Sequence, residues 1–280
     1  MKLISFLGKH GPQLAALDAD NAKDLSALAV PDVGALLNGP GLDAALEACK
    51  DAPDLGPWSQ LKLLCPVHKP QRIICVGANY DLHRQEMGRQ VLEHPTLFVR
   101  WPSSLVAHGE QVVRPKASER FDYEGELALI IGRQARSLRA EDAMPHVAGY
   151  TCFNDGSVRD FQRHTTQFTP GKNFDASGAM GPCFVSADEI HDPHNLELRT
   201  RLNGQPLQSA NTGQMSFRIP ELLAYISTFT SLQPGDVVAT GTPSGVGDKR
   251  KPPVYLKPGD RLEVEISQVG RLEVGVRQQL

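Results

Sequence analysis

Hydrophobic and polar positions along residues 121–132 follow the pattern of a β-strand that ends at a glycine. Alternate side chains of a strand share a face, so Glu124 and Glu126 lie together on one face, which continues with apolar residues. The opposite face is also apolar, which predicts burial on both sides. Neighbouring carboxylates on a buried face repel each other and lose hydration, so a positive group is expected between them.

Residues 261–267 provide a contrast within the same chain. Glu263 and Glu265 are also separated by one residue, but their face continues through Arg261 and Ser267, and only the other face is apolar. This pattern is typical of an ordinary half-solvated strand. The buried pair at 124 and 126 has no such simple explanation.

The other hydrophobic segments predict a strand-rich chain of the α+β class. Prolines and glycines between residues 53 and 70 indicate a linker, which divides the chain into a small N-terminal α/β unit, 1–66, and a larger unit, 67–280. The first unit carries no chemical motif, so we expect a scaffold or a wall of the substrate cleft. The predicted strands are 2–7, 13–17, 71–77, 96–99, 147–153, 196–202 and 237–242, and the predicted helices are 41–50 and 220–229.

Composition narrows the functional class. The 280 residues are 40% hydrophobic and 22% charged, with a net charge of −3, which gives no electrostatic reason to expect nucleic acid or an anionic membrane as a partner. The chain has no apolar run near the ~20 residues of a membrane span, and its apolar N-terminal run is too short for a secretory signal. Its five scattered cysteines favour reduced thiols. We therefore expect a cytoplasmic protein.

A further carboxylate follows the predicted strand 147–153. Asp155 stands at the end of that strand, and beside Glu124 and Glu126 it would complete an all-oxygen site. Oxygen ligands without paired His or Cys favour Mg²⁺ or Mn²⁺, allow Ca²⁺ and disfavour Zn²⁺. The alternative is that Asp155 only caps a turn, as Asn-Asp-Gly sequences commonly do.

A histidine and a carboxylate are spaced for contact in residues 78–88. If this segment is helical, His83 and Glu86 lie on one face, and the carboxylate would orient the imidazole as a base. The alternative is an exposed pair on a solvated turn. The spacing of His191 and His194 could also suit two ligands of a metal ion, but Pro193 and the lack of a third ligand argue against a metal site there.

The segment after Asp155 carries side chains suited to an anionic ligand. A short helix would aim Arg159 and Gln162 back at the proposed metal. Arg159 suits a carboxylate clamp, and the alternative is an ion pair with Asp160 or with a metal-binding carboxylate.

Several ordered motifs resemble the fumarylacetoacetate hydrolase family over residues 70–270. They are Tyr-Glu-Gly-Glu at 123–126, Phe-Asn-Asp-Gly-Ser-Val-Arg-Asp at 153–160, Gly-Lys-Asn-Phe-Asp at 171–175 and Thr-Gly-Thr-Pro-Ser-Gly-Val-Gly at 240–247. The Gly-x-Asn-Tyr at 77–80 is similar to the lead-in of acylpyruvase-type members. Members more often have Val and Ala where this chain has Gly156 and Val158, a departure that affects local shape.

The resemblance implies a mixed β-sandwich roll, usually a homodimer, and a set of site residues. The metal ligands would be Glu124, Glu126 and Asp155, the catalytic group would be His83, Glu86, Lys172 and Gln162, and the substrate would be held by Arg159, Lys172, Gln162 and Thr242. His83 would deprotonate water, and Lys172 and Gln162 would donate to the oxyanion.

The implied activity is cleavage of a carbon–carbon bond in a 2,4-diketo acid of the acylpyruvate or fumarylpyruvate type. The products would be pyruvate, or a related 2-oxo acid, and a carboxylic acid. Decarboxylation, isomerisation and lyase reactions use the same enolate chemistry and remain alternatives, as does a binding protein with a structural cation. The His-Glu pair favours hydrolysis, because hydrolysis needs an activated water.

Overall fold

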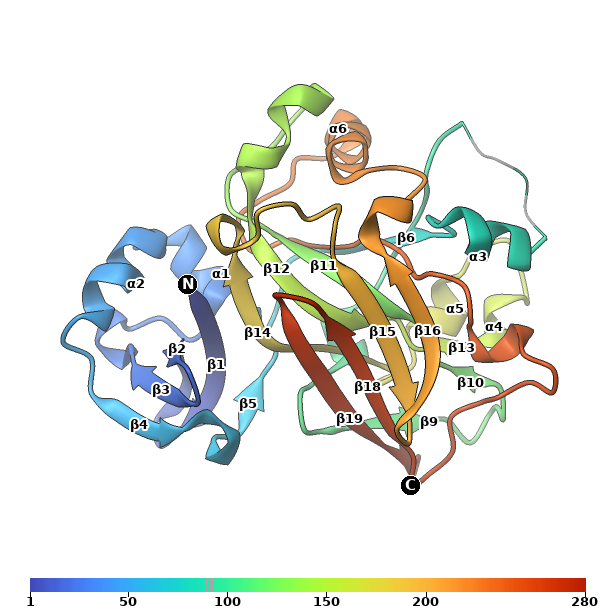
Figure 1. Ribbon diagram of the computed structural model, residues 1–280, viewed down its shortest axis with the longest axis horizontal. Coiled ribbons are helices and arrows are strands. Elements are labelled where there is room, and N and C mark those ends of the chain that lie inside the picture. Colours follow the sequence, from blue (N-terminus) through green and yellow to red (C-terminus); the bar gives the residue numbers. More distant parts are fainter. Residues whose placement is uncertain (89, 91–92) are drawn as a thin grey trace.

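The computed structural model, which describes residues 1–88, 90 and 93–280, consists mainly of β-sheets (Figure 1). The large mixed sheet has the strand order β4-β3-β2-β1-β14-β12-β11-β17-β6-β7, and a second sheet has the order β16-β15-β18-β19-β9. The helices are α1 (Val33–Asn38), α2 (Gly41–Cys49), α3 (Asp81–Glu86), α4 (Arg159–Gln162), α5 (Thr169–Lys172) and α6 (Ile219–Phe229). The predicted α+β, strand-rich class is confirmed.

The strands, in chain order, are β1 (Lys2–Gly8), β2 (Gly11–Asp18), β3 (Asn21–Asp24), β4 (Asp54–Pro57), β5 (Leu63–Leu64), β6 (Ile73–Gly77), β7 (Thr96–Val99), β8 (Leu105–Ala107), β9 (Gln111–Arg114), β10 (Phe121–Asp122), β11 (Gly125–Ile131), β12 (Val147–Asn154), β13 (Ser157–Val158), β14 (Gly178–Ser186), β15 (Glu197–Leu202), β16 (Gln205–Asn211), β17 (Val237–Ala239), β18 (Arg261–Ile266) and β19 (Gly270–Gln278). In Figure 1, β15, β16, β18 and β19 lie in front of β11, β12 and β14, as two faces of a sandwich.

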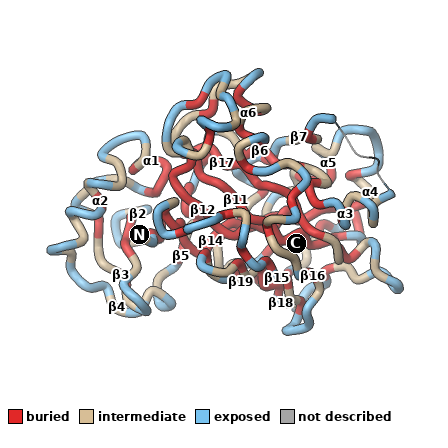
Figure 2. The backbone as a smooth tube through the Cα atoms, turned by 45° about the horizontal axis from the view of Figure 1, so that its top comes forward, coloured by how far each residue is buried: buried red, intermediate tan, exposed pale blue. Residues whose placement is uncertain are grey.

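Strand β11 is buried on both faces, as its sequence predicts. Leu127 and Leu129 belong to the core cluster that also contains Val264 of the second sheet. Ala128 and Ile130 belong to the core on the other side of the large sheet, which includes residues of the N-terminal unit. Figure 2 shows this strand and its neighbour β12 as a continuous buried band through the molecule.

The strand predicted at 121–132 is interrupted. Phe121–Asp122 forms β10 and pairs with β13, whereas β11 begins at Gly125 and pairs with β12 and β17. Glu124 therefore lies in the break, although both glutamates are buried. The strand predicted at 237–242 also ends early, at Ala239, and residues 240–246 form no regular secondary structure.

The contrasting strand at 261–267 differs in one detail from its prediction. Glu263 is buried, because Arg261 and Arg271 lie over its carboxylate, at 3.6 and 3.8 Å. The glutamate face is therefore covered by charged neighbours and not by water. Glu265 remains partly exposed, as the alternating pattern predicts.

The N-terminal unit extends the large sheet. Lys2 of β1 pairs with Val185 of β14, so the first strands are hydrogen-bonded to the sheet that carries β11 and β12. The division near residue 66 stays a prediction. The sequence analysis did not predict the short elements α1 and β4, nor the nine-residue strands β14 and β19. Among the described residues, no helix combines the length and the apolar composition that crossing a membrane requires.

Candidate functional site

Strand register brings the carboxylates together. Gly125 of β11 lies opposite Asn154 of β12, so the residues just beyond, Glu124 and Asp155, also face each other. Their backbones are joined where the Asp155 N–H donates to the Glu124 carbonyl at 2.8 Å. Ligand atoms of Glu124, Glu126 and Asp155 all lie within 4.8 Å of one another, and all three residues are buried. The predicted convergence of the acids is present in the structure.

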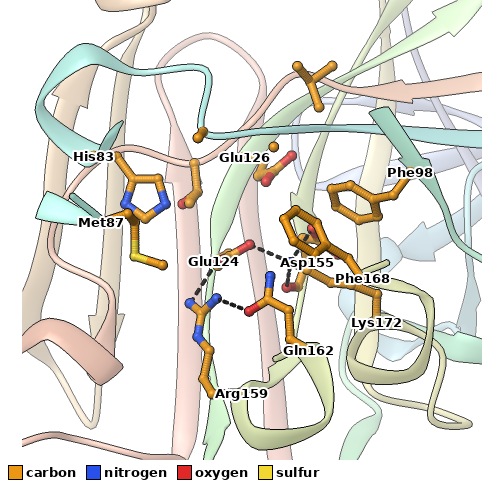
Figure 3. A pocket seen from close by; sticks show the side chains of 14 residues that line it. His83, Met87, Phe98, Glu124, Glu126, Asp155, Arg159, Gln162, Phe168 and Lys172 are labelled. Atoms are coloured by element: carbon orange, nitrogen blue, oxygen red, sulfur yellow. Dashed lines mark hydrogen bonds and ion pairs between the residues drawn. The ribbon is translucent and has the colours of Figure 1, made fainter. Parts of the chain in front are cut away.

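Glu124 is surrounded by cations. Its Oε1 lies 2.7 Å from Arg159 Nη2, and its Oε2 lies 2.6 Å from Lys172 Nζ. Burial alone would raise the pKa of Glu124, but Arg159 and Lys172 outweigh it and hold the pKa below its ordinary value. Glu124 is therefore a carboxylate, and the positive group expected from the sequence lies beside it (Figure 3).

Glu126 has a different environment. Its Oε2 accepts a hydrogen bond of 2.9 Å from the Gly241 N–H, and no cationic side chain among the described residues pairs with it. Burial, together with the neighbouring Asp155 and Glu124 carboxylates, raises the pKa of Glu126 well above its ordinary value. A positive charge close to this carboxylate would lower the free-energy cost of ionising it.

Asp155, the third acid of the cluster, contacts two cationic side chains, Lys172 and Arg100. Its Oδ2 lies 2.6 Å from Lys172 Nζ, and its Oδ1 accepts from Arg100 Nη1 at 2.6 Å. The Lys172 ammonium also lies 5.0 Å from the centroid of the Phe98 ring. Burial would lower the pKa of Lys172, yet Asp155 and Glu124 raise it overall, so the side chain is an ammonium. A cationic group therefore already fits between Glu124 and Asp155.

These observations fit a hard divalent cation. The donor set consists of carboxylate oxygens alone, which suits Mg²⁺ or Mn²⁺. Glu126, with its single backbone hydrogen bond among the described residues, is the carboxylate that such an ion would neutralise most. Glu124, Glu126 and Asp155 are the residues that would hold the ion.

His83 and Glu86 form the pair that their spacing predicts. Both belong to α3, and His83 Nδ1 lies 3.1 Å from Glu86 Oε2. Glu86 is itself held by the Gly245 N–H, at 3.1 Å to Oε1 and 3.3 Å to Oε2. A carboxylate that accepts from Nδ1–H leaves the other ring nitrogen, Nε2, as the acceptor of the neutral imidazole. His83 is buried and lines the same pocket as the acids.

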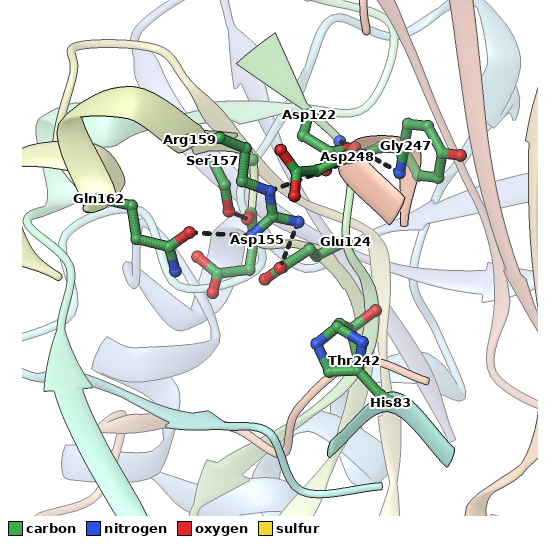
Figure 4. A network of polar contacts seen from close by, with 12 residues as sticks. His83, Asp122, Glu124, Asp155, Ser157, Arg159, Gln162, Thr242, Gly247 and Asp248 are labelled. Carbon is green, nitrogen blue, oxygen red and sulfur yellow. Dashed lines mark hydrogen bonds and ion pairs between the residues drawn. The ribbon is translucent and has the colours of Figure 1, made fainter. Parts of the chain in front are cut away.

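Arg159 is fixed by a residue that the sequence reading overlooked. Its Nε donates to Asp122 Oδ2 at 2.7 Å, and both side chains are buried (Figure 4). Asp122 also accepts from the backbone N–H groups of Gly247 and Asp248, at 2.8 and 3.0 Å. The ion pair with Asp160 that was one alternative for Arg159 does not form, because Asp160 instead accepts from Ser118. The alternative pair with a metal-binding carboxylate does form, at Glu124.

A strand pattern could have revealed Asp122. It precedes Glu124 by two residues, so simple alternation already places it on the acidic face. Arg100, the second overlooked residue, gives no such signal, because it follows β7 in an ordinary loop and reaches Asp155 only through the fold.

Replacing Asp122 with asparagine is expected to lower the free energy of unfolding by about 3–5 kcal/mol, because Arg159 would lose a buried charged partner. Denaturant titration measures this change. Asp188→Asn is the control, since Asp188 is exposed and lies 4.0 Å from its cationic partner, the N-terminal amine, so its loss should cost under about 1 kcal/mol. Equal stability of the two variants would contradict a structural role for the Asp122–Arg159 pair.

Gln162 and Thr242 also reach the pocket, with different polar groups available. The Gln162 side-chain oxygen accepts from Arg159 Nη1 at 3.0 Å, which leaves its amide N–H groups for a ligand. The Thr242 hydroxyl donates to the Gly125 carbonyl at 2.9 Å and accepts from Gln208 at 2.8 Å. Its proton is thus already used, and the Thr242 backbone N–H, which has no acceptor among the described residues, is the group left for a carboxylate.

The second histidine pair does not form a metal site. His191 is exposed, and His194 Nε2 accepts from the Ile219 N–H at 3.1 Å. Among the described residues, Glu124, Glu126 and Asp155 form the one group of three or more side chains placed to hold a metal ion. The cysteines are free thiols, and all except Cys49 are buried.

The site residues line one small polar pocket. Figure 3 shows His83 on one side of the carboxylates and Phe98, Phe168 and Lys172 on the other. The lining residues are Val76, Gly77, Ala78, His83, Met87, Phe98, Glu124, Glu126, Asp155, Arg159, Gln162, Phe168, Lys172 and Thr242. The pocket combines an acidic cluster, cationic side chains and a histidine-carboxylate pair, which suits a small anionic ligand.

Comparison with known proteins identifies similar chains. A family model described as Fumarylacetoacetate (FAA) hydrolase C-terminal matches residues 72–277. The human protein oxaloacetate tautomerase FAHD2B, mitochondrial, is 44% identical over 216 residues, which cover 76% of this chain and 69% of the human one.

Solved structures resemble the whole chain. Fumarylacetoacetate hydrolase from the psychrophile Exiguobacterium antarcticum has a TM-score of 0.89 and 36% identity, with full coverage of both chains. Maleylpyruvate hydrolase from Sphingobium sp. SYK-6, crystallised with a manganese(II) ion and pyruvate, has a TM-score of 0.84 and 33% identity, also over 100% of both chains.

Proposed function

Because this chain belongs to the fumarylacetoacetate hydrolase family, we propose that it interconverts the keto and enol forms of a short 2-oxo dicarboxylic acid of the oxaloacetate type. The observation that carries this proposal is that His83, which contacts Glu86 through Nδ1, lines the same small pocket as the acidic triad. The similarity to a protein named oxaloacetate tautomerase supports it. We propose Mg²⁺ or Mn²⁺ as cofactor, in line with the manganese complex of the similar hydrolase.

Binding would use the cationic side of the pocket. Lys172 and Arg159 supply positive charge, while Gln162 supplies amide N–H groups and Thr242 a backbone N–H. A carboxylate of the substrate therefore finds charge and directed donors together. When bound, the divalent cation would polarise the 2-oxo group and acidify the adjacent C–H bond.

Proton transfer is the task of His83. Its Nε2 removes a proton from carbon 3 of the keto acid, and the imidazolium then gives that proton to the oxygen on carbon 2, which completes the enol. The reverse sequence regenerates the keto acid, so no proton is gained or lost overall. Glu86 stabilises the imidazolium and holds its orientation through Nδ1, 3.1 Å away.

Hydrolysis of a carbon–carbon bond in a 2,4-diketo acid is the second candidate function. It is favoured by the similarity to maleylpyruvate hydrolase over the whole chain. The His83–Glu86 pair serves both reactions, since a base that takes a proton from carbon can also take one from water. The pair therefore does not favour hydrolysis in the way the sequence alone suggested. The predicted cytoplasmic location and homodimer stay predictions.

Substrate tests separate the two candidates. With Mn²⁺ or Mg²⁺ present, enol-oxaloacetate is expected to ketonise faster than in buffer, and EDTA should remove the acceleration. Acetylpyruvate, maleylpyruvate and fumarylpyruvate should remain largely intact in the same preparation, as followed by loss of diketo absorbance. Rapid release of pyruvate from these acids, without acceleration of oxaloacetate ketonisation, would replace the tautomerase proposal with the hydrolase one.

A further inference from the structure

The loop after β17, residues 240–250, contacts Glu86 of the histidine-carboxylate pair through Gly245. The Gly245 N–H donates to both oxygens of Glu86, at 3.1 and 3.3 Å, and is the backbone contact that fixes this carboxylate beside His83. Gly245 has φ of +100°, and a Cβ at this residue would lie 2.4 Å from the Leu207 carbonyl oxygen. Only glycine suits this conformation and this close approach. The direction of the N–H therefore depends on how the Gly245 backbone is held.

Arg250 and Tyr123 hold Gly245 from its carbonyl side. The Tyr123 hydroxyl donates to the Gly245 carbonyl at 3.0 Å, and Arg250 Nε donates to it at 3.3 Å. Arg250 Nη2 also donates to the Leu207 carbonyl, the same carbonyl that lies against Gly245. A single guanidinium thus joins the loop to the strand β16 beneath it.

Gly247 and Asp248, further along the same loop, contact Asp122, the partner of Arg159. The N–H groups of Gly247 and Asp248 donate to Asp122, which in turn pairs with Arg159 (Figure 4). The Arg250 N–H donates back to the Gly247 carbonyl at 3.2 Å. The loop therefore contacts Glu86 of the proton-transfer pair directly and reaches Arg159 through Asp122. Arg250 stands at its end, outside the pocket lining.

We propose that Arg250 is a positioning residue for proton transfer, acting through Gly245 on Glu86 and so on His83; this inference rests on the base role of His83 in the proposed function. Without the guanidinium, the Gly245 backbone can turn, and its N–H no longer aims at the carboxylate. Partners of this kind, which orient a catalytic group without touching substrate, typically change activity by about 10–100-fold. Arg250 does not touch the acidic triad, so cation affinity should not change.

The test compares Arg250→Met with the parent protein and repeats the substitution in a Glu86→Ala background. Methionine keeps the length of the side chain and removes its donors. We expect kcat for oxaloacetate ketonisation to fall about 10–100-fold, while KM and Mn²⁺ affinity stay within about threefold. In the Glu86→Ala background the same substitution should change kcat less than about twofold, because the group it positions is gone. Arg250→Lys, which restores one donor, should recover part of the loss.

Controls separate this role from general destabilisation. Arg139→Met removes an exposed arginine that pairs with Glu141 and Asp142, and it should leave kcat unchanged. If Arg250→Met fails to fold, Tyr123→Phe removes the other donor to the same carbonyl and is expected to give a smaller loss of kcat that also disappears in the Glu86→Ala background.

The outcomes distinguish the inference from the proposed function. A kcat for folded Arg250→Met within about twofold of the parent value, or an undiminished effect in the Glu86→Ala background, would overturn the role of Arg250. A Glu86→Ala variant with full kcat would instead overturn the base assignment on which the inference rests. Loss of kcat in both single variants, without further loss in the double variant, supports the role.

Discussion

Replacing Glu126 with glutamine is expected to abolish binding of the divalent cation without destabilising the metal-free fold. Removal of an anionic ligand should weaken Mn²⁺ binding by at least about 100-fold, because even residues that only orient a metal ligand typically change affinity by about 10–100-fold. Activity should fall together with Mn²⁺ binding. The amide oxygen can still accept from the Gly241 N–H, 2.9 Å away from the carboxylate in the parent. Burial and repulsion from Asp155 and Glu124 together raise the pKa of Glu126, and a neutral amide removes both penalties on a charged group. The melting temperature of the chelated variant should therefore equal or exceed that of the chelated parent.

Glu124→Gln is the matched comparison, because Glu124 is also a buried ligand but has cationic partners. Its replacement leaves Arg159 and Lys172 facing a neutral amide, at 2.7 and 2.6 Å in the parent. The free energy of unfolding of the metal-free protein should then fall by about 3–5 kcal/mol. Both variants should lose Mn²⁺ binding, measured by calorimetry. The same change in stability for both substitutions would show that the two carboxylates do not have the different environments described above.

His83→Gln is expected to cause the second large loss, confined to turnover. General bases typically contribute about 10²–10⁴-fold, so kcat should fall by that factor, whereas Mn²⁺ affinity and KM should stay within about threefold. Glutamine is neutral and cannot accept the proton, although it can still contact Glu86. Steady-state kinetics and calorimetry on the same preparation measure the three quantities.

His191→Gln is the control for this variant, since His191 is exposed and lies outside the pocket lining. Its kcat should equal that of the parent. If His83→Gln keeps its full kcat, His83 is not the base. If Mn²⁺ affinity is lost together with kcat, His83 acts on the metal site and not on the substrate.

The acidic triad could be predicted because its signals are local. Period-two alternation over residues 121–132 places Glu124 and Glu126 where burial is otherwise apolar, although β11 itself begins at Gly125, and β12 ends just before Asp155. The spacing of His83 and Glu86 is likewise a local property of a helix. The helical spacing needs no knowledge of how distant segments pair, whereas the approach of Asp155 to the two glutamates depends on the pairing of β11 with β12.

The residues that support the site depend on long-range pairing and could not be predicted in the same way. Arg100 reaches Asp155 across 55 positions, and the Gly245 N–H reaches Glu86 across 159. The parallel pairing of β6 with β17, which places α3 beside the loop after β17, has no counterpart in the pattern of either strand. Hydrophobic alternation shows that a strand is buried but does not identify its neighbour. Asp122 is the exception, because alternation alone could have placed it beside Glu124.

The central claim is that Glu124, Glu126 and Asp155 together hold one divalent cation beside His83. Anomalous diffraction from crystals grown with Mn²⁺ tests it most directly. We expect a single strong peak within about 2.0–2.6 Å of one oxygen of each carboxylate, the range of hard-cation bonds to oxygen. A peak elsewhere, or no peak at the triad at millimolar Mn²⁺, would contradict the account.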